Sequence, residues 1–257
     1  MRRLPNAIAA RFLPKGWIDL TRQILLFCGA YYLYRIVRGL VDGRAAQAFA
    51  NARDIIDVER ALGIFTEPAI NAWASGRAWV IDVASWMYVN SHFTVTVLTL
   101  AFLYLYRNEH FYFVRNMFMI AMGLALALYS AYPTAPPRFM PEWGFSDAVA
   151  DFTGVSPDSA SANLLFNPFA AVPSMHVAFS LMLGLPMQYM VRRLYARVLW
   201  VAYPFLVTFV VIATANHWWL DAVLGALVAA IGALGARTLG QRRPQAWAFR
   251  PAASVTA

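Results

Sequence analysis

The chain has 257 residues, of which 60% are hydrophobic and only 13% are charged. Several long apolar runs account for this excess, which is typical of a polytopic membrane protein and excludes an ordinary soluble domain. The net charge of +8 does not require a nucleic-acid partner, because basic residues gathered on one side of a membrane give the same total. The single cysteine, Cys28, excludes an intramolecular disulfide and a cysteine metal cluster.

An arginine-rich arm precedes the first apolar run. No small-residue cleavage site follows that run, so we expect an uncleaved arm rather than a removed signal peptide. Each of six apolar runs is close to the ~20 residues that cross a bilayer core. The predicted fold is all-α, with a cytoplasmic arm at 1–19, a six-helix membrane domain at 20–240 and a cytoplasmic tail at 241–257. The predicted spans are 20–41, 79–106, 112–132, 174–191, 196–215 and 218–238.

The basic residues predict the orientation of these spans. With the N-terminus inside, most of the 21 lysines and arginines fall in inner segments, and most acidic residues fall on the other side. We therefore expect an integral protein of the plasma membrane with both termini in the cytoplasm. The spans 174–191 and 218–238 then both begin at the outer surface.

Residues 42–78 are too polar to span a membrane. Their charges and apolar residues separate with a helical period, which predicts an amphipathic helix lying on the outer surface. Glu59 falls on the apolar side, so it is either a tolerated glutamate near a helix end or a contact with the loops of the site. The apolar positions are Ala45, Phe49, Ala52, Ile56 and Leu62.

The second span carries two polar residues, Asn90 and His92. Counted from the cytoplasmic end at Arg107, His92 lies about 23 Å along the helix. That depth is the outer part of a bilayer core about 30 Å thick. A structural role and a substrate contact are both consistent with this position, and the same holds for Asn90.

The third span ends in a proline-rich segment, residues 133–137, which precedes Arg138. The prolines stop the helix and stiffen an extended chain, so Arg138 is expected at the outer mouth. The loop continues to residue 173, and loops of this length are usually functional or disordered. Its aromatic residues favour a folded lid or a lipid-facing cover over disorder.

The fourth and sixth spans each open with a histidine. Ser174 and His176 are expected in the first turn of one helix, and His217 in the first turn of the other. Asp221 follows His217 by four residues and therefore shares its side of the helix. An aspartate there can fix the imidazole tautomer and leave the other nitrogen as base or nucleophile. The sixth span continues with small residues that allow close helix approach, namely Gly225, Ala229, Gly232 and Ala236.

These features together predict an anion-binding pocket. Helix N-termini supply free backbone N–H groups and a positive dipole end, and Arg138 adds a bidentate donor. Phosphoryl transfer fits this set without a metal or another cofactor, since one histidine can attack phosphorus while the other protonates the leaving oxygen.

The run Pro173-Ser174-Met175-His176, followed in the sixth span by His217 and Asp221, resembles the type 2 phosphatidic acid phosphatase superfamily. The resemblance covers about residues 42–238. It implies that His217 is the nucleophile that becomes a phosphohistidine and that Asp221 orients it. It also implies that His176 is the general acid and that Ser174 and Arg138 bind phosphate.

Further segments resemble the inositol phosphotransferase branch of that superfamily, which includes inositol phosphorylceramide synthases. The segments are 60–65, 90–93, 167–176 and 214–217. In this branch Thr214 and Asn216 lie in the position of substrate or phosphate contacts. Ala131 and Val211 stand where the superfamily usually has a lysine and an arginine, and Phe139 replaces a proline. A phosphodiester or another lipid-linked phosphate carries less charge and tolerates this loss, so we expect a lipid substrate at the outer leaflet.

Three alternatives remain open at this point. A metal site could use His176, His217 and Asp221, although it would leave Arg138 and Ser174 unused. An intramembrane serine hydrolase could use Ser174, although no Gly-x-Ser-x-Gly elbow is present. A transporter or scaffold could bind a lipid head group without chemistry, although binding alone does not need an oriented histidine–aspartate pair.

Overall fold

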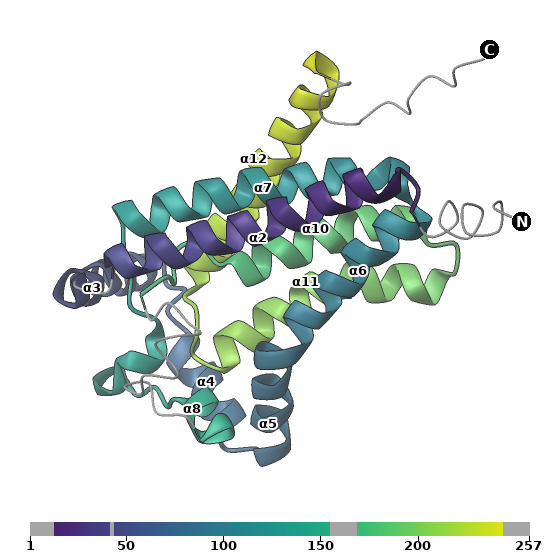
Figure 1. Ribbon diagram of the computed structural model, residues 1–257. Coiled ribbons are helices and arrows are strands. Elements are labelled where there is room, and N and C mark those ends of the chain that lie inside the picture. The colour runs from purple at the N-terminus through teal and green to yellow at the C-terminus, as the bar shows by residue number, and fades with distance from the viewer. Residues whose placement is uncertain (1–12, 42–43, 155–168, 244–257) are drawn as a thin grey trace, which may run out of the picture.

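The computed structural model describes residues 13–41, 44–154 and 169–243 (Figure 1). Regular structure in these ranges is helical, apart from one isolated parallel bridge between Thr134 and Ala170. The predicted all-α class is therefore confirmed for the described residues. Asn167 and Pro168, which belong to the motif before the fourth span, lie outside them.

Each predicted span lies mostly in helix, and the helix ends differ from the predicted bounds by a few residues. The second span is one continuous stretch that contains a π-helical turn, η2. Four stretches are long and apolar enough to cross a membrane: Ala78–Tyr106, Asn108–Ala131, Leu194–Ala213 and Trp219–Arg242. Six complete spans remain a prediction. The long helices are α2 (Gly16–Val41), α5 (Ala78–Trp86) with η2 (Met87–Ser91) and α6 (His92–Tyr106), α7 (Asn108–Ala131), α10 (Met175–Met190), α11 (Leu194–Ala213) and α12 (Trp219–Arg242).

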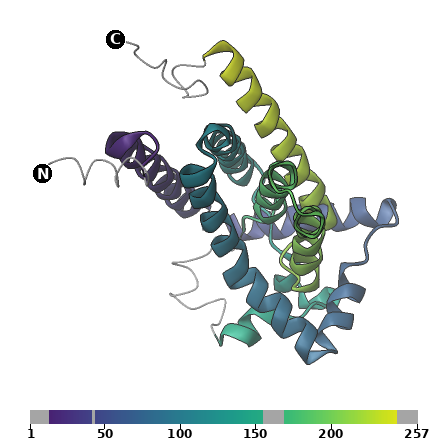
Figure 2. The same ribbon diagram turned by 90° about the vertical axis from the view of Figure 1, so that its right-hand side faces the viewer.

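The core of the bundle lies where α7, α10 and α12 meet. Buried side chains such as Tyr112, Phe118 and Leu183 form its largest apolar cluster. In Figure 1, α2, α7 and α10 run side by side and α12 crosses them. Figure 2 places α7 between α2 and α12, so α2 packs mainly on α7 at the edge of the bundle.

The small residues of α12 are buried in this core, as predicted. A Cβ atom at Gly225 would lie 2.3 Å from the carbonyl oxygen of Ser174, and one at Gly232 would lie 3.0 Å from that of Met117. Backbone atoms cannot move aside like a flexible side chain. Glycine at position 225 therefore allows α12 to approach the start of α10.

Hydrogen bonds fix the relative directions of the helices. The Tyr112 hydroxyl donates to Asp19 at 2.6 Å, so α2 and α7 start at the same end. At the opposite end the Tyr129 hydroxyl of α7 donates to the Pro173 carbonyl at 3.0 Å, just before α10. We call this second end, where α7 ends and α10 and α12 begin, the site end.

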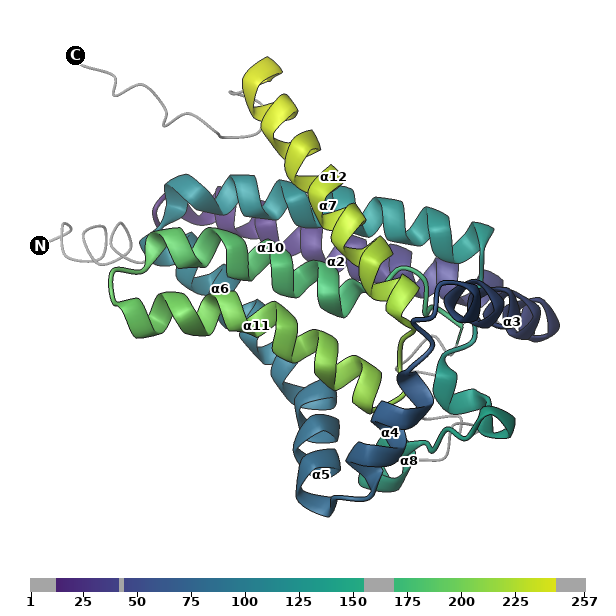
Figure 3. The ribbon, with the colours of Figure 1, turned by 180° about the vertical axis from the view of Figure 1, so that it is seen from behind.

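Two helices, rather than one, form from residues 42–78, and both cover the site end (Figure 3). They are α3 (Ala45–Ala61) and α4 (Glu67–Ser75), and α4 was not predicted. Leu62 is 61% exposed just after α3, so the predicted stripe is wrong at that position. The position of α3 on a membrane surface stays a prediction. The buried residues of α3 are Ala48, Asn51, Ala52, Ile55, Ile56 and Glu59.

The described part of the long loop after α7 is folded, as expected. It contains two short 3-10 turns, η3 (Pro137–Phe139) and η4 (Pro141–Trp143), and the helix α8 (Ala148–Thr153). Phe145 packs edge-on against Trp218, with ring centroids 5.6 Å apart. The loop thereby contacts the start of α12.

Candidate active site

A tight turn delivers His217 from α11 to the start of α12. Ala215 has a positive φ of 53°, which is uncommon for a residue other than glycine. The Thr214 hydroxyl donates to the Val210 carbonyl at 2.7 Å, and the Asn216 amide donates to the Thr214 hydroxyl at 2.8 Å. Thr214 and Asn216 therefore hold the turn in this structure, and their predicted contact with substrate stays a prediction.

The imidazole of His217 is held through Nδ1. This atom lies 3.0 Å from the Ala171 carbonyl oxygen and 3.2 Å from Asp221 Oδ2. A carbonyl oxygen can only accept a hydrogen bond, so Nδ1 carries the hydrogen. Nε2 of the neutral ring then keeps a free lone pair, which is the form that a nucleophile or a base requires.

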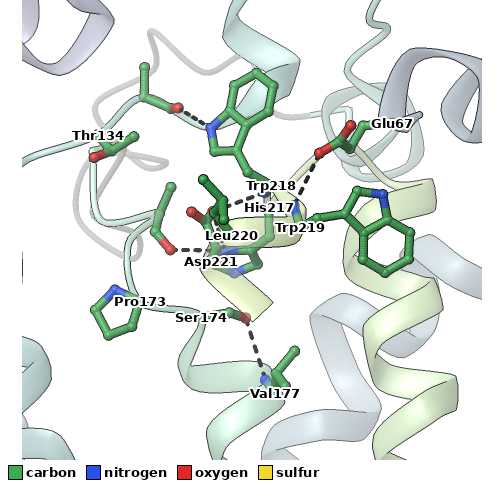
Figure 4. Close-up of polar contacts among 12 residues, drawn as sticks. Glu67, Thr134, Pro173, Ser174, Val177, His217, Trp218, Trp219, Leu220 and Asp221 are labelled. Carbon is green, nitrogen blue, oxygen red and sulfur yellow. Dashed lines mark hydrogen bonds and ion pairs between the residues drawn. The ribbon is translucent and has the colours of Figure 1, made fainter. Parts of the chain in front are cut away.

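Asp221 connects the starts of the two helices. Its side chain is fully buried, and Oδ2 also accepts the Trp218 backbone N–H at 2.9 Å. Its backbone carbonyl accepts the Ser174 N–H at 3.0 Å. The two histidine-bearing stretches therefore meet, with Ser174 directly beside the His217–Asp221 pair (Figure 4).

The second histidine, His176, lies between His217 and a third histidine. Its ring centroid is 5.6 Å from that of His217 and 4.5 Å from that of His92. Tyr88 stacks on it at 4.6 Å. The π-helical turn directly precedes His92, and such turns are frequent at functional sites. Asn90 does not join this group, because it is exposed and donates to the Trp86 carbonyl.

Arg138 reaches the same turn through its backbone. Its N–H donates to the Ala215 carbonyl at 2.8 Å. Its guanidinium lies 3.8 Å from Asp147 and is mostly buried, with Nε unpartnered within the described residues. The proline-rich segment before Arg138 is held against the same turn, because the Trp218 indole donates to the Ala135 carbonyl at 3.1 Å.

The first backbone N–H groups of α12 are already occupied by carboxylates. Those of Trp218, Trp219 and Leu220 donate to Asp221, Glu67 and Glu59 at 2.9, 3.0 and 2.8 Å. The expectation that this helix start offers free donors to phosphate is therefore wrong.

The start of α10 is different. The Ser174 hydroxyl accepts the Val177 N–H at 3.4 Å, and the N–H groups of Met175 and His176 have no partner within their helix. An anion can therefore bind at this helix start.

Glu59 contacts the site, as one of its two interpretations expected, and it has a partner that sequence reasoning missed. Glu59 and Glu67 are both fully buried. Burial, followed by a hydrogen bond with Glu67, raises the pKa of Glu59 from 4.5 to about 9. The signal for Glu67 was available in Thr66-Glu67-Pro68, an acidic residue and a proline at a helix start.

A small hollow opens beside the histidines between η2 and α11. It is lined by Tyr88, His92 and His176 together with apolar residues such as Val207 and Val211. Among the residues that the structure describes, no group of three or more histidine, cysteine, aspartate or glutamate side chains is arranged to hold a metal ion.

Comparison with known proteins gives a family. The family model described as the PAP2 superfamily matches residues 53–235, which is more than half of the chain. The matched range runs from α3 to α12 and contains all of the candidate residues above. No curated protein and no solved structure matches the chain.

Proposed function

Because the chain belongs to the PAP2 superfamily, and thus to phosphatase-type phosphoester hydrolases and transferases, we propose that it acts on a lipid phosphoester through a phosphohistidine on His217. The observation that carries this proposal is the arrangement of the His217 ring. Two acceptors hold the hydrogen on Nδ1 and leave Nε2 as the free nitrogen, with a second imidazole 5.6 Å away.

The proposed reaction has two steps. His217 Nε2 attacks phosphorus, the bond from phosphorus to the alcohol oxygen breaks, and His176 gives its proton to that oxygen. Water or an acceptor hydroxyl then attacks the phosphohistidine, the phosphorus–nitrogen bond breaks, and His176 takes up the proton of the incoming hydroxyl. Asp221 stabilises the positive charge on the His217 ring in both steps.

The open start of α10 supports a phosphate position. The N–H groups of Met175 and His176 and the Ser174 hydroxyl can donate to phosphate oxygens. Arg138 can add a charged donor once it exchanges its contact with Asp147 for the substrate. His92 contacts His176 and is proposed to line the substrate path beside the apolar hollow.

The proposed substrate is a lipid phosphate or a lipid-linked phosphodiester at the outer leaflet of the plasma membrane. The apolar wall beside His176 suits a lipid, and Ala131 and Val211 in place of cations suit a phosphate of low charge. The resemblance to inositol phosphotransferases supports an alcohol acceptor as an alternative to water.

The test incubates the purified protein in EDTA with labelled lipid phosphates, lipid pyrophosphates and lipid phosphodiesters. Free phosphate identifies a phosphatase, and a new labelled lipid identifies a transferase. Quenching during turnover should trap an acid-labile, base-stable adduct on wild-type protein and none on His217→Ala.

A matched control is His110→Ala. His110 is the one of the four histidines that lies outside the group at the site end; it is exposed and paired with Glu109. This variant should form the adduct at the wild-type level. If His217→Ala keeps full activity, the protein instead binds a head group without this chemistry.

A further inference from the structure

Two buried glutamates from different helices hold the start of α12. Glu59 Oε1 accepts the Leu220 N–H at 2.8 Å, and Glu67 Oε1 accepts the Trp219 N–H at 3.0 Å. Figure 4 shows Glu67 reaching the first turn of α12 from the side opposite Ser174. Trp219 and Leu220 lie between His217 and Asp221 in the chain, so these bonds fix the segment that sets the distance between the ring and its carboxylate.

The second oxygen of each glutamate is buried without a partner. Neither Oε2 of Glu59 nor Oε2 of Glu67 has a hydrogen-bond partner within the described residues. The two carboxyl groups accept from the N–H groups of adjacent residues, Trp219 and Leu220, so they lie close together. A hydrogen bond with Glu67 is one of the causes that raise the pKa of Glu59. Two ionised carboxylates offer no hydrogen for such a bond, so one of them must be protonated.

We infer that Glu59 and Glu67 share one proton and act as a pair of positioning residues that fixes His217 for attack. The inference rests on the proposed function of His217. Loss of the proton would bring two buried negative charges together beside Asp221. The repulsion would separate α3 from α4 and release the Trp219 and Leu220 N–H groups.

Amide substitutions separate a proton-sharing pair from two independent contacts. In Glu59→Gln or Glu67→Gln, the amide oxygen keeps the backbone bond and the amide NH₂ donates to the remaining carboxylate. Both single variants should therefore form the phosphohistidine within about threefold of the wild-type rate. In the double variant, two NH₂ groups face each other without an acceptor. Its rate should fall about 10- to 100-fold at an unchanged KM.

The pair also predicts a pH signature. The ionisable groups that act on Glu59 are Glu67 from α4 and Asp221 from α12. The pKa of Glu59 is raised, so the stability that its protonated form contributes is present at low pH and is lost as pH rises through about 9. Wild-type activity and melting temperature should both fall as the pH rises toward about 9. Glu59→Gln should lose this fall, because its amide does not titrate.

The experiment measures the adduct rate, KM and melting temperature from pH 6 to 10.5, a range chosen to bracket about pH 9. It compares wild type, both single variants, the double variant and Glu142→Gln. Glu142 is an exposed glutamate of η4 and should behave as wild type. Equal rates in the double and single variants, or the same high-pH fall in Glu59→Gln, would overturn the inference.

If wild type forms no adduct with any donor, the proposed function fails. The melting temperatures still decide whether the pair shares a proton. If the double variant does not fold, the pH profiles of the single variants carry the decision.

Discussion

The starts of α10 and α12 lie side by side but use their backbone N–H groups differently. At α12 three carboxylates occupy the first N–H groups, and all three carboxylates are buried. At α10 one serine hydroxyl accepts one N–H at 3.4 Å, and His176 beside it is only partly buried. The same helix dipole therefore serves two purposes: it stabilises built-in carboxylates at α12 and is left for an anionic ligand at α10.

The difference explains how one site can be both rigid and accessible. A nucleophile must be oriented before substrate arrives, whereas a phosphate subsite must offer donors that no protein group already uses. The Ser174 N–H bond to the Asp221 carbonyl joins the two halves, so a displacement of one start is transmitted to the other.

The largest expected effect comes from forcing the two starts apart. In Gly225→Ala, the new Cβ would lie 2.3 Å from the Ser174 carbonyl oxygen, which is backbone and cannot rotate away. We expect a loss of about 1–3 kcal/mol in stability and a nearly complete loss of activity. Melting temperature and adduct formation measure the two effects.

Alanine substitutions at two other glycines serve as controls for this prediction. Gly232→Ala meets the Met117 carbonyl oxygen at 3.0 Å and should be milder, and Gly123→Ala meets nothing within 4 Å and should be neutral or stabilising. If all three variants behave alike, close approach at position 225 does not position the site.

The next prediction concerns the start of α12 alone, where carboxylates occupy the backbone N–H groups. Asp221→Asn can still accept the His217 and Trp218 N–H groups through its amide oxygen, so the fold and the melting temperature should change little. The negative charge that stabilises the cationic ring is lost, and kcat should fall about 10²- to 10⁴-fold. A rise in KM with an unchanged kcat would instead mean that Asp221 contacts the substrate.

Much of this arrangement could be predicted from the sequence. Apolar periodicity identified the long helices, and the spacing of His217 and Asp221 indicated their contact. His217 was predicted in the first turn of the helix, but it lies just before the N-cap residue Trp218. The small residues of α12 correctly indicated close packing. These features are local or periodic, so a single chain segment contains the information.

The features that sequence reasoning missed depend on contacts between distant segments. Glu67 reaches Trp219, and the Ala171 carbonyl reaches His217, across many intervening residues. Periodicity carries no information on such pairs. For the same reason the α12 start was expected to be free, although its donors are filled from α3 and α4.

The smallest expected effect concerns the start of α10, where backbone N–H groups are left for a ligand. Ser174→Ala removes both the cap of α10 and the hydroxyl proposed to bind phosphate. Loss of an N-cap costs about 0.5–2 kcal/mol, and the 3.4 Å distance favours the lower end. Glycine at an N-cap costs only a few tenths of a kcal/mol, so Ser174→Gly should preserve stability while it removes the hydroxyl.

The comparison of these two variants separates capping from substrate binding. If the Ser174 hydroxyl binds phosphate, both variants should raise KM by about tenfold, the worth of a hydrogen bond to a charged group, although only Ser174→Ala lowers the melting temperature. If KM follows the melting temperature instead, Ser174 acts only as a cap. The Met175 and His176 N–H groups, with Arg138, would then form the phosphate position, and the difference between the two helix starts would lie in the backbone alone.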